Sequence, residues 1–141
     1  MLLAEHAKNQ DFLQRIPIKS NGRIFFVPVI QIDWIDAESN YSRLYVGQNS
    51  YVIRETITNL EMKLDSHQFV RIHRSTIVNA DRIREMQLWK NGDYKVVLED
   101  TTVLNVTPRY KKRLQDVVGK PIKLLHSRSR SITIETPVYE L

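Results

Sequence analysis

Short strand-like segments separated by tight turns run through most of the chain. Residues 16–19 and 23–29 flank Asn21-Gly22, a dipeptide typical of two-residue hairpin turns, and Asn91-Gly92 separates two further strand-like segments. Strands this close together leave no room for the crossover of a dozen or more residues that parallel pairing requires. The sequence therefore predicts a mostly β fold of about eight short strands, most of them paired antiparallel.

Two segments interrupt the strands and have the spacing of short helices. In residues 56–64 the apolar side chains recur every three to four positions, and either Thr56 or Thr58 is placed to cap the helix. In residues 107–119, Pro108 fits the first helical position and Gly119 fits the end of the helix. We therefore expect one or two short helices beside the sheets.

Composition excludes several classes of protein. The 141 residues are enough for one domain, and a hydrophobic content of 42% is typical of a globular core. The chain has no cysteine, which excludes disulfides and thiolate metal sites. Its longest mainly apolar run, residues 24–32, is far shorter than the ~20 residues of a membrane span, and its first ten residues do not resemble a signal peptide. We therefore expect a cytoplasmic protein.

The positive charge is concentrated towards the end of the chain. Residues 1–100 contain 13 basic and 13 acidic side chains, whereas residues 101–141 contain eight basic and three acidic ones. The whole net charge of +5 therefore lies in the final 41 residues, which suggests a polyanionic partner. A solvated basic tail is an equally good interpretation of the charge alone.

The sequence gives little support to catalysis. The four histidines lack the spacing of a metal site, and the four glycines do not cluster into a phosphate-binding loop. His73 and Ser75 share a face of a strand, but no third residue is placed to orient them as a base and a nucleophile. We therefore expect no enzyme and no cofactor.

Polar side chains gather where the predicted strands end. They form three groups, Glu-Ser-Asn at 38–40, His-Arg-Ser at 73–75 and Thr-Pro-Arg at 107–109. Arginine and asparagine have the donor and acceptor pairs that match guanine and adenine edges in the major groove of DNA. Lysine, serine, threonine and helix N-terminal amides are typical phosphate ligands. The three groups are therefore candidates for contacts with nucleic acid.

Four segments in collinear order resemble the LytTR DNA-binding domain of bacterial response regulators. They read VIQIDWIDAESNYSRLYV, RETITNLEMKL, FVRIHRSTIVNADRI and VTPRYKKRL, within a match that covers roughly residues 18–118. The third segment, with its pattern aromatic-x-Arg-x-His-Arg-Ser-x-x-Val-Asn, is the most specific. The resemblance implies an elongated, almost all-β domain, an arrangement of small antiparallel sheets in a row with one or two short helices. In such domains loops, rather than a recognition helix, enter successive major grooves.

The resemblance also implies which residues contact double-stranded DNA. One reading loop would follow residues 35–39, a second would lie at the corner after residue 73, and a third would open the last helix. The expected base contacts are Asn40, Tyr41, Ser42, Arg74 and Arg109, and the expected backbone contacts are His73, Ser75, Lys111 and Lys112.

Four of these residues have structural alternatives. Arg109 would only occupy the N-terminus of a helix, where the helix dipole disfavours positive charge. Arg74 would be an ordinary surface arginine if it paired with Asp81 or Glu85. Asn40 would serve the turn alone if the loop needs it there, although the two roles can coexist. His73 would hold the loop by hydrogen bonds instead of donating to a phosphate.

Residues 69–79 combine core-forming side chains with unpaired charge. Phe69, Ile72 and Ile77 are expected in the core, yet Arg71 lies among them with no acidic residue inside the segment. We expect Arg71 to find its partner within the fold.

The sequence divides into three parts. Residues 1–16 are predicted to be a linker or N-terminal extension, residues 17–119 the LytTR-like domain and residues 120–141 a basic extension. Response regulators of this type carry a receiver domain upstream, which the residues before the domain are too few to form. The resemblance further implies repeated DNA sites and self-association on them. A protein-interaction β-module, or a non-specific polyanion binder that uses its basic C-terminal region, is the alternative.

Overall fold

The computed structural model describes residues 11–129, and their side chains as far as residue 119. Within that range the chain forms ten β-strands, two α-helices and two short 3-10 turns. The elements are β1 (Arg15–Ser20), β2 (Arg23–Pro28), a 3-10 turn (Val29–Gln31), β3 (Trp34–Glu38), β4 (Tyr41–Val46), β5 (Asn49–Ile53), α2 (Ile57–Lys63), β6 (Phe69–His73), β7 (Thr76–Asn79), a 3-10 turn (Ala80–Arg82), β8 (Ile83–Leu88), β9 (Tyr94–Leu98), β10 (Val103–Val106) and α3 (Pro108–Ser129).

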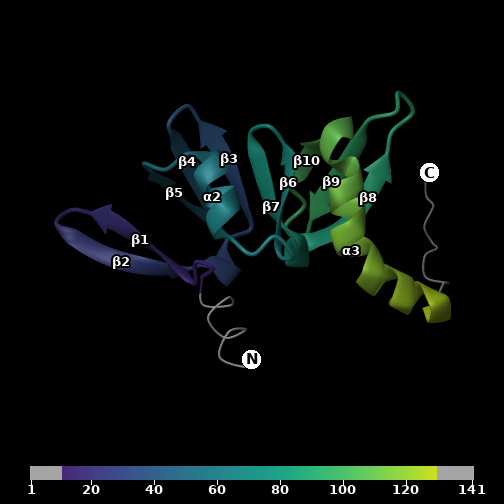
Figure 1. Ribbon diagram of the computed structural model, residues 1–141, viewed down its shortest axis with the longest axis horizontal. Coiled ribbons are helices and arrows are strands. Elements are labelled where there is room, and N and C mark those ends of the chain that lie inside the picture. The colour runs from purple at the N-terminus through teal and green to yellow at the C-terminus, as the bar shows by residue number, and fades with distance from the viewer. Residues whose placement is uncertain (1–10, 130–141) are drawn as a thin grey trace.

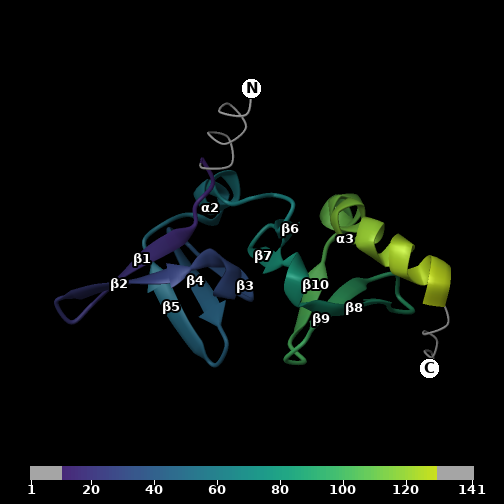
Figure 2. The same cartoon turned by 90° about the horizontal axis from the view of Figure 1, so that it is seen from below.

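The strands form three antiparallel sheets that lie in a row (Figure 1). A five-stranded sheet in the order β5-β4-β3-β7-β6 occupies the middle, the hairpin β1–β2 lies at one end and the three-stranded sheet β10-β9-β8 at the other. Figure 2 shows the same row from below, with α3 beside the three-stranded sheet. The predicted mostly β fold of small antiparallel sheets is therefore confirmed, and the described residues contain ten strands where the sequence suggested about eight.

Two hydrophobic cores flank the β6–β7 pair, one on each face of the sheet. The hairpin β1–β2 and α2 cover the face where Phe69 and Ile77 are buried, and α3 with the three-stranded sheet covers the face where Val70 and Val78 are buried. Successive side chains of a strand point to opposite faces, so a strand buried on both sides needs consecutive apolar residues. Each fully buried side chain of this size contributes about 1.5–3 kcal/mol, which makes this pair of strands the central support of the fold.

The first hairpin turn has the conformation that its sequence predicts. Asn21 and Gly22 have φ values of 52° and 75°, and they join Ser20 to its cross-strand partner Arg23. Two adjacent residues with positive φ are typical of a type I′ turn, whose twist matches that of the paired strands.

The helices differ from their predicted boundaries in one respect. The hydroxyl of Thr56 accepts a hydrogen bond from the backbone N–H of Asn59 at 3.1 Å, so Thr56 rather than Thr58 is the N-cap of α2. The prediction that the last helix ends at Gly119 is wrong, because α3 continues to Ser129. Gly119 is helical and lacks the left-handed conformation with which glycine commonly ends a helix.

The expected boundary between residues 119 and 120 therefore falls inside α3. Residues 1–10 and 130–141, which belong to the expected N- and C-terminal extensions, lie outside the described residues. Within the described range, no helix is long and apolar enough to cross a membrane.

Candidate nucleic-acid interface

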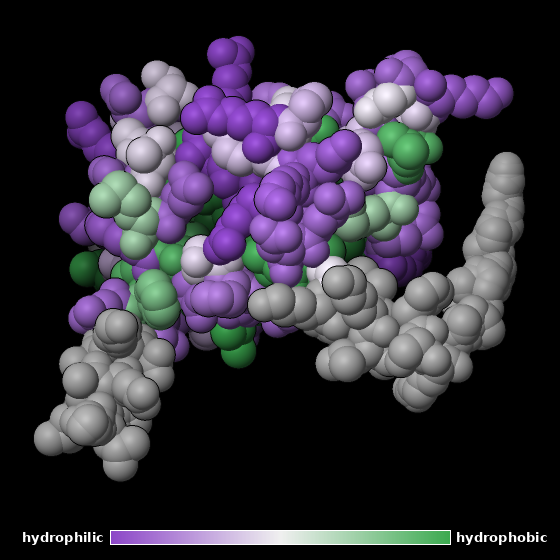
Figure 3. Space-filling model, turned by 45° about the vertical axis from the view of Figure 1, so that its right-hand side comes forward, coloured by the Kyte–Doolittle hydropathy of each residue, from purple (hydrophilic) through white to green (hydrophobic). Residues whose placement is uncertain are grey.

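The three segments expected to contact DNA lie on one edge of the molecule, along the top in Figure 1. The backbone N–H of Ala37 in β3 donates to the carbonyl of Ser75 at 2.8 Å, and the N–H of Thr107 donates to the carbonyl of Ile72 in β6 at 3.0 Å. The corner between β6 and β7 is therefore bonded to β3 on one side and to the start of α3 on the other. Figure 3 shows hydrophilic residues over most of this side. We call residues 38–41, 73–75 and 107–112 the loop edge.

The β3–β4 turn exposes two of its predicted base-contacting side chains. Ser39, and not Asn40, has the left-handed backbone conformation in this turn, with a φ of 63°. The turn therefore does not need an asparagine at position 40 for its backbone conformation. Asn40 is exposed, and Tyr41 is 43% exposed. Both side chains are therefore available to a partner.

The structure corrects the prediction for Ser42. Its side chain is fully buried, and its hydroxyl donates to the backbone carbonyl of Glu55 at 2.7 Å. Ser42 lies on the same inward face of β4 as Leu44, so its hydroxyl cannot reach a base edge without opening the sheet. Ser42 holds the segment that leads into α2, and it is not a base-contacting residue in this fold.

Two carboxylates beside the β3–β4 turn limit the positive charge there. Glu38 forms an ion pair with Arg43, whose Nε lies 2.8 Å from the carboxylate. Burial and the nearby Glu38 carboxylate raise the pKa of Asp36. This part of the loop edge is thus less favourable for phosphate than the corner and the start of α3, which carry arginines and lysines.

Arg71 stabilises the corner between β6 and β7 through hydrogen bonds of its guanidinium. Its Nε donates to the carbonyl of His73 at 3.0 Å, its Nη2 donates to the carbonyl of Arg74, and its Nη1 pairs with Glu61 of α2 at 2.7 Å. The side chain is only 11% exposed, and its guanidinium lies 6.0 Å from the ring centre of Tyr110 in α3. The expectation that Arg71 finds its partner within the fold is confirmed. Its contact with two corner carbonyls was not visible in the sequence.

His73 is half-buried and takes part in the internal bonding of the corner. Its Nδ1 accepts a hydrogen bond from the backbone N–H of Ser75 at 3.2 Å and lies 3.0 Å from the hydroxyl of Ser75. Because Nδ1 accepts this hydrogen bond, the proton of a neutral ring is on Nε2. The structural role expected as one alternative is therefore present, and Nε2 keeps a donor for a phosphate.

Arg74 is exposed at the tip of the corner. Among the residues that the structure describes, it forms no salt bridge. The two alternative partners are engaged elsewhere, since Asp81 accepts from Gln68 at 3.5 Å and Glu85 accepts from Gln87 at 2.6 Å. The backbone of Arg74 is held while its guanidinium projects to solvent.

The start of α3 contributes the remaining cations. Arg109 is exposed with its guanidinium 5.5 Å from the ring centre of Tyr110, and the first turn contains no acidic residue. Lys112 is also exposed. Lys111 is half-buried, and its Nζ lies 4.4 Å from the ring centre of Tyr94 in β9. Lys111 is therefore partly engaged within the fold, whereas Arg109 and Lys112 face solvent.

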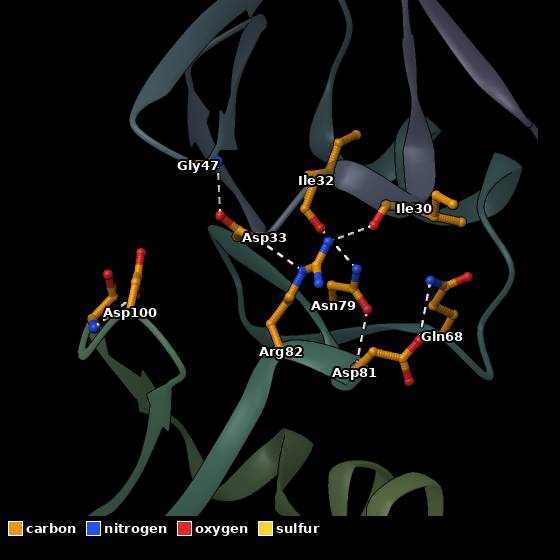
Figure 4. A network of polar contacts seen from close by, with 10 residues as sticks. Ile30, Ile32, Asp33, Gly47, Gln68, Asn79, Asp81, Arg82 and Asp100 are labelled. Atoms are coloured by element: carbon orange, nitrogen blue, oxygen red, sulfur yellow. Dashed lines mark hydrogen bonds and ion pairs between the residues drawn. The ribbon is translucent and has the colours of Figure 1, made fainter.

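A second polar cluster lies at the opposite ends of β3 and β7 (Figure 4). Arg82 lies between Asp33, whose Oδ1 is 2.9 Å from its Nε, and the carbonyl of Ile30, which accepts from its Nη2 at 2.9 Å. Asn79 is fully buried and donates to the carbonyl of Ile32 at 2.8 Å. Because Arg82 directly precedes β8, this cluster fixes where the chain leaves the five-stranded sheet for the three-stranded one. Asn79, although part of the most specific sequence segment, has a structural role.

Sequence comparison places this arrangement among known proteins. The chain matches the family model described as the LytTr DNA-binding domain over residues 22–119. It is 31% identical over 112 residues to the sensory transduction protein LytT of Bacillus subtilis and 30% identical over 106 residues to the sensory transduction protein LytT of Enterococcus faecalis. These matches cover 79% and 75% of the chain but 44% of each relative, so the chain spans less than half the length of these relatives.

A solved structure shares the fold. The fold matches that of a LytTr DNA-binding domain of a putative methyl-accepting/DNA response regulator from Bacillus cereus with a TM-score of 0.67. The match covers 76% of this chain and 98% of that one. At 17% sequence identity this match shows the arrangement of strands and helices and nothing about individual contacts. The family model covers more than half of the chain and includes all three parts of the loop edge. The chain belongs to the LytTR family of DNA-binding domains.

Proposed function

We propose that the loop edge binds double-stranded DNA in a sequence-specific manner, as the DNA-reading part of a bacterial transcriptional regulator. The observation that carries the proposal is the exposure of Asn40, Arg74 and Arg109 on one edge. The three residues come from separate parts of the chain, and backbone hydrogen bonds join the supporting segments. The relatives named as sensory transduction proteins support the regulatory part of the proposal.

The projecting segments enter successive major grooves on one face of the duplex. Arg74 and Arg109 present the paired donors that match guanine, and the amide of Asn40 matches adenine. Tyr41 lies beside Asn40 and supplies an aromatic surface with a hydroxyl. Loss of one bidentate base contact costs about 1–3 kcal/mol and relaxes the preference at one base pair.

Phosphate neutralisation supplies most of the affinity. Lys112 is the best placed lysine because it is exposed beside Arg109, and Lys111 has to leave the Tyr94 ring to reach a phosphate. At the corner, His73 donates through Nε2, and Ser75 contributes its hydroxyl. Such contacts release counterions from DNA, so the affinity falls steeply with salt.

Selection from a random DNA pool tests the proposal. Bound duplexes are separated by mobility shift, amplified and sequenced, and we expect an enriched motif. Two copies of the motif about one helical turn apart would show that two protomers bind side by side. Binding without enrichment would replace the proposal with non-specific polyanion binding. Absence of binding would favour a protein partner.

A matched pair of variants tests the central base contact. Arg74→Ala removes the exposed guanidinium at the corner, and Arg23→Ala removes an exposed arginine from the β1–β2 hairpin, far from the loop edge. We expect Arg74→Ala to lose about 1–3 kcal/mol for the selected site and to relax one base pair of the motif. Arg23→Ala should retain the affinity for the selected site and the full motif. Equal behaviour of the two variants would remove Arg74 from the base-reading set.

A further inference from the structure

The β8–β9 hairpin projects beyond the rest of its sheet. The last residue of β10, Val106, is paired with Tyr94, the first residue of β9. From Val106 the chain turns into α3, whereas the hairpin continues outward through residues 88–93 before it reverses. This tip lies at the right-hand end of the same edge that carries the β6–β7 corner and the start of α3 (Figure 1).

The tip exposes apolar side chains beside lysines. Leu88 is 66% exposed and Trp89 is 48% exposed. Lys90 is exposed next to them, and the Nζ of Lys95 lies 4.7 Å from the ring centre of Trp89. Leu88 lies opposite Tyr94, whereas Trp89 lies over Lys95 on the other face of the hairpin. The tip therefore exposes an apolar side chain on each face, with the lysine Lys90 at its end.

The tip is held in one conformation by its own hydrogen bonds. The backbone N–H of Trp89 donates to the carbonyl of Asp93 at 2.8 Å, and the N–H of Gly92 donates to the carbonyl of Trp89 at 2.9 Å. Gly92 has a φ of 91°, which a residue with a side chain adopts only with strain. A partner therefore meets an ordered surface and loses little affinity to ordering it.

The polar groups of the tip favour a backbone contact over base recognition. Both polar atoms of the Asn91 side chain are engaged with Asp93, since Nδ2 donates to its carboxylate at 3.0 Å and Oδ1 accepts from its N–H at 3.0 Å. Asn91 is therefore not free to match adenine, and the carboxylate of Asp93 is partly satisfied. Lys90 remains as an exposed cation, a typical phosphate ligand.

The tip is continuous with the proposed DNA-reading surface. Lys111 of α3 lies over Tyr94, the residue at which β9 leaves the tip, with its Nζ 4.4 Å from the ring centre. Arg109 precedes Lys111 by two residues on the same helical turn. Leu88 pairs with Tyr94 across the hairpin and therefore lies on the same face as Lys111, and Lys90 follows at the end of the tip. A duplex held at Arg109 therefore continues past Leu88 and Lys90.

We propose that the β8–β9 tip is a fourth DNA contact, which binds the sugar-phosphate backbone just outside the groove read by Arg109. Lys90 neutralises a phosphate there, and Leu88, on the face shared with Tyr94 and Lys111, packs against the adjoining deoxyribose. This contact rests on the proposed DNA binding of the loop edge and extends its footprint in one direction. It adds affinity and length of site without adding a base preference.

The test uses the motif selected by the intact chain and compares three variants. Lys90→Ala removes the cation, Leu88→Ala removes the exposed apolar side chain, and Lys19→Ala is the control, an exposed lysine of the distant β1–β2 hairpin. We expect Lys90→Ala to reduce the slope of log affinity against log salt by about 0.9, the value for one lost phosphate. In hydroxyl-radical footprints, Lys90→Ala and Leu88→Ala should each shorten protection at one end only, with the same preferred motif.

The outcomes separate this contact from the proposed function. If the intact chain enriches a motif but both tip variants keep its full footprint and salt slope, the fourth contact is excluded and the loop-edge function stands. If the variants change the preferred bases, the tip reads sequence and the backbone assignment is wrong. If the intact chain protects no DNA, both proposals fail together. Lys90→Ala retains Trp89 and every backbone bond of the turn, so its result does not depend on refolding of the tip.

Discussion

Replacing Arg71 with methionine removes the hydrogen bonds that hold the β6–β7 corner but leaves Arg74, the proposed base contact, in place. Methionine keeps an unbranched apolar stem but loses the hydrogen bonds from the guanidinium to Glu61 and to the carbonyls of His73 and Arg74. Hydrogen bonds from a charged group contribute about 1.5–3 kcal/mol each when they are buried. Glu61 is 41% exposed and regains water, and the variant also escapes the cost of burying a charge. We therefore expect a loss of about 2–3 kcal/mol in the free energy of unfolding.

Arg71→Met should weaken DNA binding in addition to lowering stability. A domain with a stability of about 5–15 kcal/mol remains folded after such a loss, so binding can be measured on folded protein. Without Arg71, the carbonyls of His73 and Arg74 lose their shared donor, and the backbone of Arg74 is no longer held in position. We expect at least a tenfold loss of affinity, about 1.4 kcal/mol, and a weaker preference at the base pair that Arg74 reads, with the preference at the Arg109 position retained.

Arg82→Met is the matched control for Arg71→Met. Arg82 is also a partly buried arginine with a carboxylate and a carbonyl partner, but it lies in the polar cluster away from the loop edge. Urea unfolding monitored by circular dichroism gives the stability of both variants, and selection from the DNA pool gives their base preferences. We expect both to lose stability and only Arg71→Met to lose the Arg74 preference. An Arg71→Met variant with an unchanged motif would refute the positioning role.

Three further changes test single steps of the reasoning. Ser42→Ala leaves the carbonyl of Glu55 without its donor, so urea unfolding should show a loss of about 1–3 kcal/mol while the DNA motif stays the same. The raised pKa of Asp36 means that the folded state holds this proton to a higher pH than the unfolded state, so stability falls as pH rises from about 3.8 through the raised value. Asp36→Asn should flatten that fall in thermal melts between pH 3 and 7 and be the more stable form at neutral pH; an unaltered profile would show that another group causes it. Lys112→Ala should weaken binding to all DNA sequences alike and lower the salt slope by about 0.9 in titrations.

Features of the fold that depend only on residues adjacent in the sequence were predictable from it. The Asn21-Gly22 turn specifies its own conformation, because both residues tolerate positive φ. Paired apolar residues at 69–70 and 77–78 indicated core strands, but their two-sided burial depends on α3 and the β1–β2 hairpin, which come from opposite ends of the chain. Gly119 shows the limit, since a glycine can end a helix or lie within one, and the surroundings decide between them.

The fate of individual site residues was less predictable. Ser42 was grouped with Asn40 and Tyr41 as part of one loop, although the alternation along β4 puts it on the same face as Leu44. That alternation was a sufficient signal for its burial. The partner of Arg71 had no such signal, because Glu61 is ten residues away on a different element and the other two acceptors are backbone carbonyls. Arginine at a buried strand position predicts an internal partner but does not identify it.

The burial of β6 and β7 on both faces gives the exposed arginine at their corner the fixed backbone that the proposed base contact requires. An exposed arginine gains precision only if its backbone is fixed, and each strand leading to this corner is held in two cores. The pairing register shifts between Arg71 and His73, an irregularity that bends the chain and lets residues 73–75 leave the sheet. Arg71 then donates to the two carbonyls that this bend releases, of which the His73 carbonyl is partly buried and would otherwise lack a protein donor. In the proposed function the two arginines therefore have complementary roles, in which Arg71 fixes the corner and the exposed Arg74 is available for a base.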